Sequence, residues 1–325
     1  MATDSRSKQR RRGRRRIIGK QFPRGPKQLW SHAAGNGSSG AAITENKVII
    51  FHRVRNEELV ECCDVETGKP LWSSRFPTRF RPQVGSTDGP LAVPLIQKNT
   101  VFVYGTSGIL AALNFTTGDV LWQKNLINEY RAQEGYFGPG SSPILVDDLL
   151  IINAGVSEPK QGWWRLDQAT GKEVWKSTSE HASYSSPIVY EAGGRKFILI
   201  TTRMNTYLLD AKTGAEIDKV PFGQRGPTVN AANPVLTGDH FLLTASYGIG
   251  SVWELSQPTV FKSNGRTKIY LRANTRRVFL IKIIYSGLMD VRIWGNQFCA
   301  VSILKLRAYL GANRAWLCDP DSRGR

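Results

Sequence analysis

One short motif occurs four times in this chain, and its spacing limits the fold more than any other feature. The copies are CDVETGKPLW at Cys63–Trp72, LNFTTGDVLW at Leu113–Trp122, LDQATGKEVW at Leu166–Trp175 and the divergent LDAKTGAEI at Leu209–Ile217. Their glycines, at positions 68, 118, 171 and 214, are 50, 53 and 43 residues apart. Repeats of this period are typical of propeller blades or solenoid turns.

Each copy has the chemistry of a tight hairpin turn. An Asp or Asn near its start can cap the backbone two residues on, and a Gly four positions later allows the positive φ that closes the turn. Alternating apolar residues around the turn indicate strands, and the tryptophan that ends three copies is expected to bury its ring between neighbouring sheets. The predicted structural signature consists of Asp64, Gly68, Trp72, Asn114, Gly118, Trp122, Asp167, Gly171, Trp175, Asp210 and Gly214.

A second periodicity marks the start of each unit. Prolines at positions 94, 143, 187 and 234 each precede an apolar strand pattern. A second apolar strand follows, as at Thr100–Tyr104, and a third leads into the repeated turn and a fourth. This order predicts an all-β propeller of four-stranded antiparallel blades. About five blades are recognisable, the fifth having Gly250–Leu255 as its third strand, so the ring is expected to be incomplete.

The repeats resemble the tryptophan-docking motif of the bacterial PQQ-like (quinoprotein-type) β-propellers over residues 28–255. That family includes quinoprotein alcohol dehydrogenases and an outer-membrane-assembly lipoprotein. The resemblance is specific for fold and less so for activity. The lack of carboxylate–amide cation sites and the incomplete ring favour a non-catalytic binding or assembly scaffold. The alternative is a fragment of a pyrroloquinoline-quinone-dependent alcohol or sugar dehydrogenase.

The formal net charge of +18 belongs to the two ends of the chain. Residues 1–27 and 258–325 each carry +10, which leaves the segment between them near neutral. The run of arginines before residue 17 is expected to be disordered because like charges repel. A basic tail that binds nucleic acid is a third hypothesis, but the segment lacks interleaved aromatic residues, and the sequence argues against a nucleic-acid partner.

Residues 256–325 form the third predicted region, an irregular basic tail. The run VFLIKIIY at Val278–Tyr285 fits a strand or a helix, but no hairpin motif accompanies it. One hypothesis is an irregular extension. The other is that the segment is a frameshifted remnant of a further blade, since a reading frame shifted by two nucleotides permits an approach to another Asp-x-x-Thr turn.

The sequence assigns no catalytic residue and no metal site, and it favours a protein that is not an enzyme. Only the dehydrogenase alternative implies PQQ with Ca²⁺ as cofactors, held by carboxylate and amide oxygens. Some of these dehydrogenases have a vicinal disulfide beside the quinone, but Cys62 and Cys63 fit ordinary strand cysteines better. Asp147-Asp148 fits a hairpin tip. The four histidines are expected in loops or turns, without metal-ligand spacing: His32, His52, His181 and His240.

Two longer segments between blades, Thr78–Gln83 and Glu129–Gly140, are candidates for ligand contact, because loops on a rigid scaffold commonly bind ligands. The partner is predicted to be a protein or a small molecule on the propeller face, and the protein is expected to be a monomer. The family resemblance implies export to the periplasm or cell surface. The chain as written shows neither a signal peptide nor an apolar run long enough for a transmembrane helix.

Overall fold

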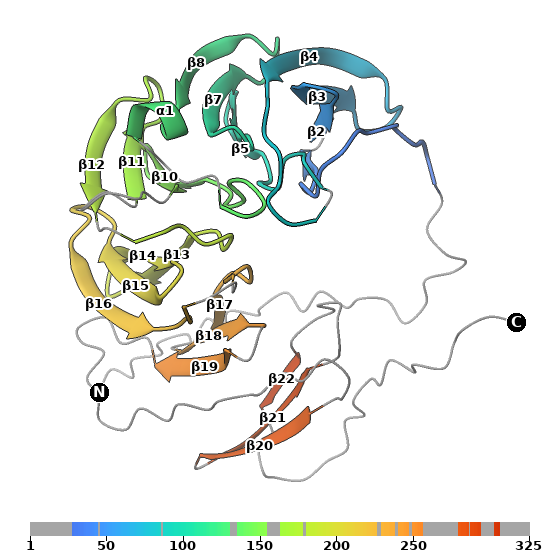
Figure 1. The fold of residues 1–325 in the computed structure, drawn as a ribbon. Helices are drawn as coiled ribbons and strands as arrows, with labels where there is room; N and C mark the ends of the chain where they lie inside the picture. Colours follow the sequence, from blue (N-terminus) through green and yellow to red (C-terminus); the bar gives the residue numbers. More distant parts are fainter. Residues whose placement is uncertain are drawn as a thin grey trace, which may run out of the picture.

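The computed structural model contains six antiparallel sheets that follow one another in sequence order around an arc (Figure 1). It describes residues 28–44, 46–85, 87–130, 135–154, 163–177, 180–225, 229–237, 240–246, 249–255, 279–285, 287–293 and 302–305. The predicted disorder of residues 1–27 lies outside these ranges. No helix among the described residues is long and apolar enough to cross a membrane.

The first three sheets have four strands each, paired in sequence order. The first contains β1 (Ala42–Ile43), β2 (Lys47–Val54), β3 (Glu57–Asp64) and β4 (Pro70–Pro77). The second contains β5 (Leu95–Gln97), β6 (Thr100–Tyr104), β7 (Ile109–Asn114) and β8 (Val120–Asn125), followed by the short helix α1 (Leu126–Tyr130). The third contains β9 (Ile144–Val146), β10 (Leu149–Asn153), β11 (Trp163–Asp167) and β12 (Glu173–Ser177).

The fourth sheet has four strands, and the fifth and sixth have three each among the described residues. The fourth contains β13 (Ile188–Ala192), β14 (Arg195–Thr201), β15 (Asn205–Asp210) and β16 (Glu216–Pro221). The fifth contains β17 (Val235–Thr237), β18 (His240–Ala245) and β19 (Gly250–Leu255). The sixth contains β20 (Phe279–Tyr285), β21 (Gly287–Ile293) and β22 (Ser302–Lys305).

These sheets confirm the predicted all-β propeller with four-stranded antiparallel blades. A strand begins directly after each of the four periodic prolines, as at Leu95 after Pro94. Proline lacks a backbone donor and is therefore tolerated at the start of a strand. Of the two conformations open for the run at Val278–Tyr285, its described residues Phe279–Tyr285 have the strand, β20. The division of the chain into three regions stays a prediction.

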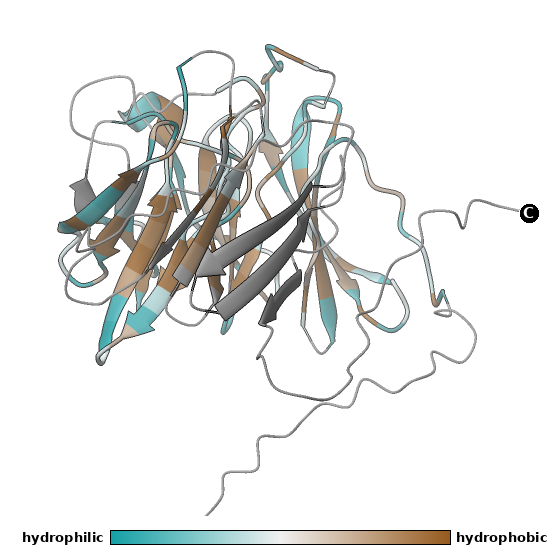
Figure 2. Cartoon of the chain, turned by 90° about the horizontal axis from the view of Figure 1, so that it is seen from below, coloured by the Kyte–Doolittle hydropathy of each residue, from teal (hydrophilic) through white to brown (hydrophobic). Residues whose placement is uncertain are grey.

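Apolar side chains fill the space between successive sheets. Between the first two sheets, Ile49 and Val60 pack against Val101 and Leu113. Similar clusters lie between the second and third sheets, the third and fourth, and the fourth and fifth. Figure 2 shows hydrophobic colour along the strand interiors and hydrophilic colour at many of the turns. Burial of these faces is the main force that holds neighbouring blades together.

The blades have two distinct ends. The hairpin end carries the four repeated turns, beginning with the one between β3 and β4. The loop end carries the segments that connect successive sheets and the turns between each second and third strand. The outer strands β4, β8, β12 and β16 form the rim in Figure 1.

Candidate functional site

At the hairpin end, the repeated turn has the same hydrogen-bond pattern in each copy. The Asp64 carboxylate accepts from the backbone N–H groups of Glu66 and Thr67, at 3.2 and 2.8 Å. The Gly68 N–H donates to the Asp64 carbonyl at 2.9 Å, and φ of Gly68 is +69°. The other three copies repeat this contact through Asn114, Asp167 and Asp210, with φ between +66° and +82° at their glycines.

Two tryptophans connect their blades to the repeated turn of the next blade. The Trp72 indole N–H donates to the Phe115 carbonyl at 3.1 Å, and the Trp122 indole N–H donates to the Gln168 carbonyl at 2.9 Å. A Cβ on Gly118 would lie 2.6 Å from the Trp72 ring, so glycine is required where the ring crosses the turn. The Trp175 side chain lies outside the described part, and its docking stays a prediction.

The sequence analysis missed one such contact, made by Trp30. Its indole N–H donates to the Val65 carbonyl at 2.8 Å, and its ring lies against Gly68. The only signal was the tripeptide QLW at 28–30, which resembles the PLW and VLW endings of two copies. No Asp-x-x-Thr-Gly precedes it, so the tripeptide does not match the repeat.

At the loop end, a relay of hydrogen bonds connects consecutive blades through the residue that precedes each periodic proline. The Val93 N–H donates to Ser142 Oγ at 2.8 Å, the Ser142 N–H donates to Ser186 Oγ at 2.9 Å, and the Ser186 N–H donates to Asn233 Oδ1 at 2.7 Å. The proline period was visible in the sequence. The pairing of its neighbours depended on how the blades stand side by side.

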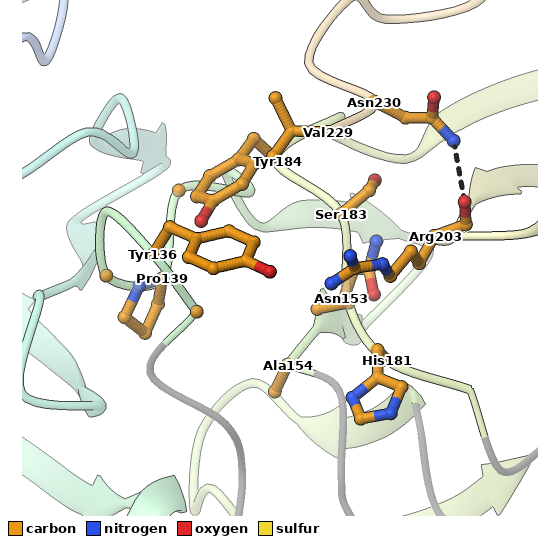
Figure 3. A pocket seen from close by; sticks show the side chains of 14 residues that line it. Tyr136, Pro139, Asn153, Ala154, His181, Ser183, Tyr184, Arg203, Val229 and Asn230 are labelled. Atoms are coloured by element: carbon orange, nitrogen blue, oxygen red, sulfur yellow. Dashed lines mark hydrogen bonds between the residues drawn. The ribbon is translucent and has the colours of Figure 1, made fainter. Parts of the chain in front are cut away.

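The candidate site is a pocket at the loop end, between the third and fourth sheets (Figure 3). Its cavity volume is about 40 Å³. The lining comes from five chain segments and includes Tyr136, Asn153, His181, Tyr184, Arg203 and Asn230. Tyr136 belongs to the predicted segment Glu129–Gly140, whereas no residue of Thr78–Gln83 lines the pocket. The two segments still meet, because the Gln83 N–H donates to the Tyr136 carbonyl at 2.9 Å.

Tyr184 is enclosed by the loop at residues 135–140. Its hydroxyl accepts from the Phe137 N–H at 3.1 Å, and its ring meets the Phe137 ring at 5.6 Å in an edge-on arrangement. A Cβ added to Gly135 or Gly140 would lie 2.8 Å from the Tyr184 side chain. Burial raises the pKa of Tyr184, with the Phe137 N–H opposing, so the hydroxyl stays protonated.

Two buried amides line the same pocket. The Asn153 Nδ2 donates to the Thr201 carbonyl at 3.1 Å, and the Asn230 Nδ2 donates to the Thr202 carbonyl at 2.8 Å. Both side chains are about 2% exposed, and the Oδ1 atom of each has no partner among the described residues. Beside them, the Arg203 guanidinium lies 5.7 Å from the centre of the Tyr136 ring. The pocket thus presents a cation, aromatic rings and amide oxygens.

The pocket contains no activated nucleophile, and His181 is its one side chain of the type that acid–base catalysis most often uses. Its serine, Ser183, donates its hydroxyl proton to the Thr201 carbonyl, so it is not activated by His181. Its lining contains no Asp or Glu.

The same residues do not fit a quinone with Ca²⁺. A hard cation prefers carboxylate ligands, and sites for drug-sized ligands measure roughly 300–1,000 Å³, well above the volume of this pocket. Cys62 and Cys63 are both free and buried in β3, and neither lines the pocket. Burial raises the pKa of both thiols, that of Cys62 to about 11.

The remaining sequence candidates have clear positions. Asp147 and Asp148 form the turn between β9 and β10. The expectation that every histidine lies in a loop or turn is wrong for His52 and His240, which lie in β2 and β18. The fold also brings His32 and His52 together at Glu61, a cluster that sequence spacing did not reveal because His32 and Glu61 are 29 residues apart.

A family model described as "Outer membrane protein assembly factor BamB" matches residues 22–157 and 56–264, which together exceed half of the chain. The chain belongs to this family. It is a PQQ-like β-propeller. The crystal structure of BamB from Moraxella catarrhalis superimposes with a TM-score of 0.53 at 15% identity, covering 82% of this chain and 77% of that one. This match supports the fold alone.

Two curated relatives have related sequences. The tetrathionate hydrolase of Acidithiobacillus ferrooxidans is 21% identical over 254 residues, which are 74% of this chain and 47% of the relative. The outer membrane protein assembly factor BamB of Kangiella koreensis is 23% identical over 219 residues, which are 66% of this chain and 50% of the relative. This chain therefore spans about half the length of either protein.

Proposed function

We propose that this protein is a non-catalytic binding scaffold whose loop end docks a partner through the pocket between the third and fourth sheets. The observation that carries the proposal is the composition of that pocket, which offers Arg203, His181 and aromatic rings without a carboxylate or an activated nucleophile. Membership of a family described by an assembly factor supports the same reading. Because such relatives are named outer membrane protein assembly factors, we also propose that the protein is exported and works in outer membrane assembly.

Among the side chains of the pocket, the Arg203 guanidinium favours a carboxylate as the group that binds there. An arginine guanidinium presents a planar fork of donors that matches a carboxylate, and the Tyr136 ring beside Arg203 keeps the guanidinium partly shielded from water. A volume of about 40 Å³ suits one such group. The partner would therefore insert a single acidic side chain, while the rest of it lies on the surrounding loops.

The Arg203 side-chain Nε–H resonance tests this proposal directly. We expect N-acetylglutamate to shift it with a dissociation constant of about 1 mM, the strength of a weak single contact. N-acetylglutamine, which has the same shape without the charge, should cause no comparable shift. Arg203→Gln should remove the response, while Arg75→Gln, on the exposed face of β4, should retain it. Equal responses to both compounds would refute the carboxylate site.

A separate titration tests the non-catalytic part of the proposal. Addition of PQQ with Ca²⁺ is expected to give no saturable change in quinone absorbance. Stoichiometric uptake of the quinone would overturn the scaffold function in favour of a dehydrogenase, even if the carboxylate contact at Arg203 were real.

A further inference from the structure

The segment at residues 28–40, here called the strap, runs along the first sheet from its hairpin end to its loop end. Trp30 contacts the repeated turn at one end. At the other end, Asn36 forms a backbone bridge with Arg53 and its side chain donates to Asp88 Oδ1 at 3.0 Å. The strap forms no longer ladder with any strand in the part of the chain that the structure describes. Side-chain contacts therefore help to hold it, beside the backbone N–H groups of Ser38 and Ser39, which donate to the Pro90 carbonyl at 2.8 and 2.9 Å.

Midway along the strap, two histidines meet one carboxylate. His32 Nε2 lies 2.8 Å from Glu61 Oε2, and His52 Nε2 lies 2.7 Å from the same oxygen. The side chains of His32, His52 and Glu61 are 17%, 6% and 22% exposed. The cluster connects the strap to β2 and β3 at a site largely shielded from solvent.

The backbone fixes where the protons lie in this cluster. The Gly35 N–H donates to His52 Nδ1 at 2.8 Å, so this nitrogen must present a lone pair. The neutral ring then carries its proton on Nε2 and donates it to Glu61. His32 donates to Glu61 in the same way, and its Nδ1 lies 3.9 Å from Cys63 Sγ.

The same contact argues against a metal ion, although the three ligand atoms lie within 4.8 Å of one another. A metal on His52 Nε2 would require the proton of the neutral ring to sit on Nδ1, where it would face the Gly35 N–H. Histidines that ligate metals normally donate their second ring N–H to an acceptor. His52 has a donor there instead.

We propose that this cluster is an acid-operated latch that holds the strap on the first sheet. A proton added to His52 Nδ1 points at the Gly35 N–H and breaks the contact between strap and β2. A second proton, on His32, places two cations beside the single Glu61 carboxylate. These two changes release the strap from the sheet, and protonation of Glu61 at still lower pH removes the common acceptor as well.

The groups around the latch do not change the direction of this response to pH. On β3, Cys63 is the other titratable side chain at the cluster, and burial raises its pKa, so it stays neutral. Beyond Gly35, the guanidinium of Arg53 lies 3.4 Å from the Asp88 carboxylate, so that these charges are paired. Among the described residues, the latch therefore depends on the two imidazoles and Glu61.

Hydrogen exchange of the full-length protein between pH 7.5 and 5, corrected for the intrinsic rates, tests the latch. We expect protection of a peptide covering the strap to fall at least tenfold, while a peptide covering β6 and β7 keeps its protection. The double variant His32→Gln, His52→Gln should keep the strap protected at pH 5. Glutamine can accept and donate as the neutral ring does, but it cannot gain a proton.

Glu61→Gln supplies a second variant, because it weakens the acceptor shared by both rings. It should open the strap at pH 7.5, and Glu57→Gln in the exposed part of the same strand should not. If the wild-type strap stays protected at pH 5, or loses protection together with β6 and β7, the latch is refuted. One equivalent of Zn²⁺ that protects the strap, and does so only with both histidines present, would replace it with a metal site. The wild-type profile and the Zn²⁺ titration decide the question even if a variant fails to fold.

Discussion

The strap and β4 each dock a tryptophan on a repeated turn of neighbouring blades, but they differ in how their backbones are paired. Trp30 on the strap and Trp72 on β4 each donate an indole N–H to the turn of the next sheet, at 2.8 and 3.1 Å. β4 is also paired with β3 along its whole length, whereas the strap has one backbone bridge to the sheet, Asn36 to Arg53, and two backbone hydrogen bonds to the Pro90 carbonyl. Tryptophan docking therefore does not require a ladder, but the ladder decides how firmly the docked segment is held.

The two faces of β3 repeat this contrast. Cys62 belongs to an apolar cluster that continues into the second sheet, and Glu58 is fully buried with Thr106 of that sheet as its partner. Towards the strap, Glu61 meets two imidazoles. One interface combines apolar burial with a single buried carboxyl group, and the other joins a carboxylate to two imidazoles, so their stabilities should respond differently to mutation and pH.

Removal of either tryptophan should show the largest difference in stability between the strap and β4. Trp72→Ala should lower the free energy of unfolding by about 3 kcal/mol, the lower end of the range for large-to-small changes. Trp30→Ala should lower it by about 1 kcal/mol, because the strap can open locally while the sheets stay folded. Urea denaturation measures both losses. Equal losses would mean that the strap is as firmly integrated as β4.

Crowding the same rings from the turn side gives a smaller difference. Gly118→Ala places a methyl group 2.6 Å from the Trp72 ring at a residue with φ of +82° and should cost about 3 kcal/mol, of which 1–2 comes from the left-handed backbone. Gly68→Ala meets Trp30 just as closely, but the strap can move away. The loss of stability should therefore approach the contribution of the left-handed backbone alone. Thermal unfolding of both variants checks this order.

The pH dependence of stability should differ in sign between the two glutamates of β3. Burial acts to raise the pKa of Glu61, but hydrogen bonds from His32 and His52 outweigh it and hold the pKa below its usual range. Its stabilising contribution is therefore present above the unfolded pKa and lost as pH falls through the folded pKa.

Burial raises the pKa of Glu58, against the hydrogen bonds from Thr106. Its contribution is largest below the unfolded pKa and decreases as pH rises through the folded pKa. Urea denaturation of Glu61→Gln between pH 4 and 7 should show about 1 kcal/mol less dependence on pH, the scale of one typical hydrogen bond, and Glu58→Gln should change the slope in the opposite sense.

The smallest effect is expected at the exposed ion pair between β4 and β3. Arg75 Nη1 lies 3.1 Å from Glu57 Oε2, and both side chains are about half exposed. Arg75→Ala should change the free energy of unfolding by less than about 0.5 kcal/mol, since water screens such pairs. A larger loss in urea denaturation would mean that surface charge, and not the ladder, holds β4.

The fold was predictable because each repeated turn and strand is determined by residues close to one another in the sequence. The turn at Asp64–Gly68 is closed by a side chain and a glycine only four residues apart, and the proline period marks the first strand of each sheet. Trp30 escaped prediction because it lacks the turn that defines the repeat. The pocket was predicted only in part. Tyr136 lies in a predicted loop, but Asn153 ends a strand and Arg203 lies in a short turn, where nothing local suggests a site.

The sequence by itself determined the blade, since its turns, strand patterns and docking tryptophans act over a few residues or recur at a fixed period. Only the tertiary structure decided which side chains meet between blades. Asn153 and Arg203 share a pocket because the third and fourth sheets stand next to each other, and His32 reaches Glu61 because the strap runs the length of the first sheet. Such contacts join residues tens of positions apart, and their partners are set by the stacking of whole sheets rather than by any local pattern.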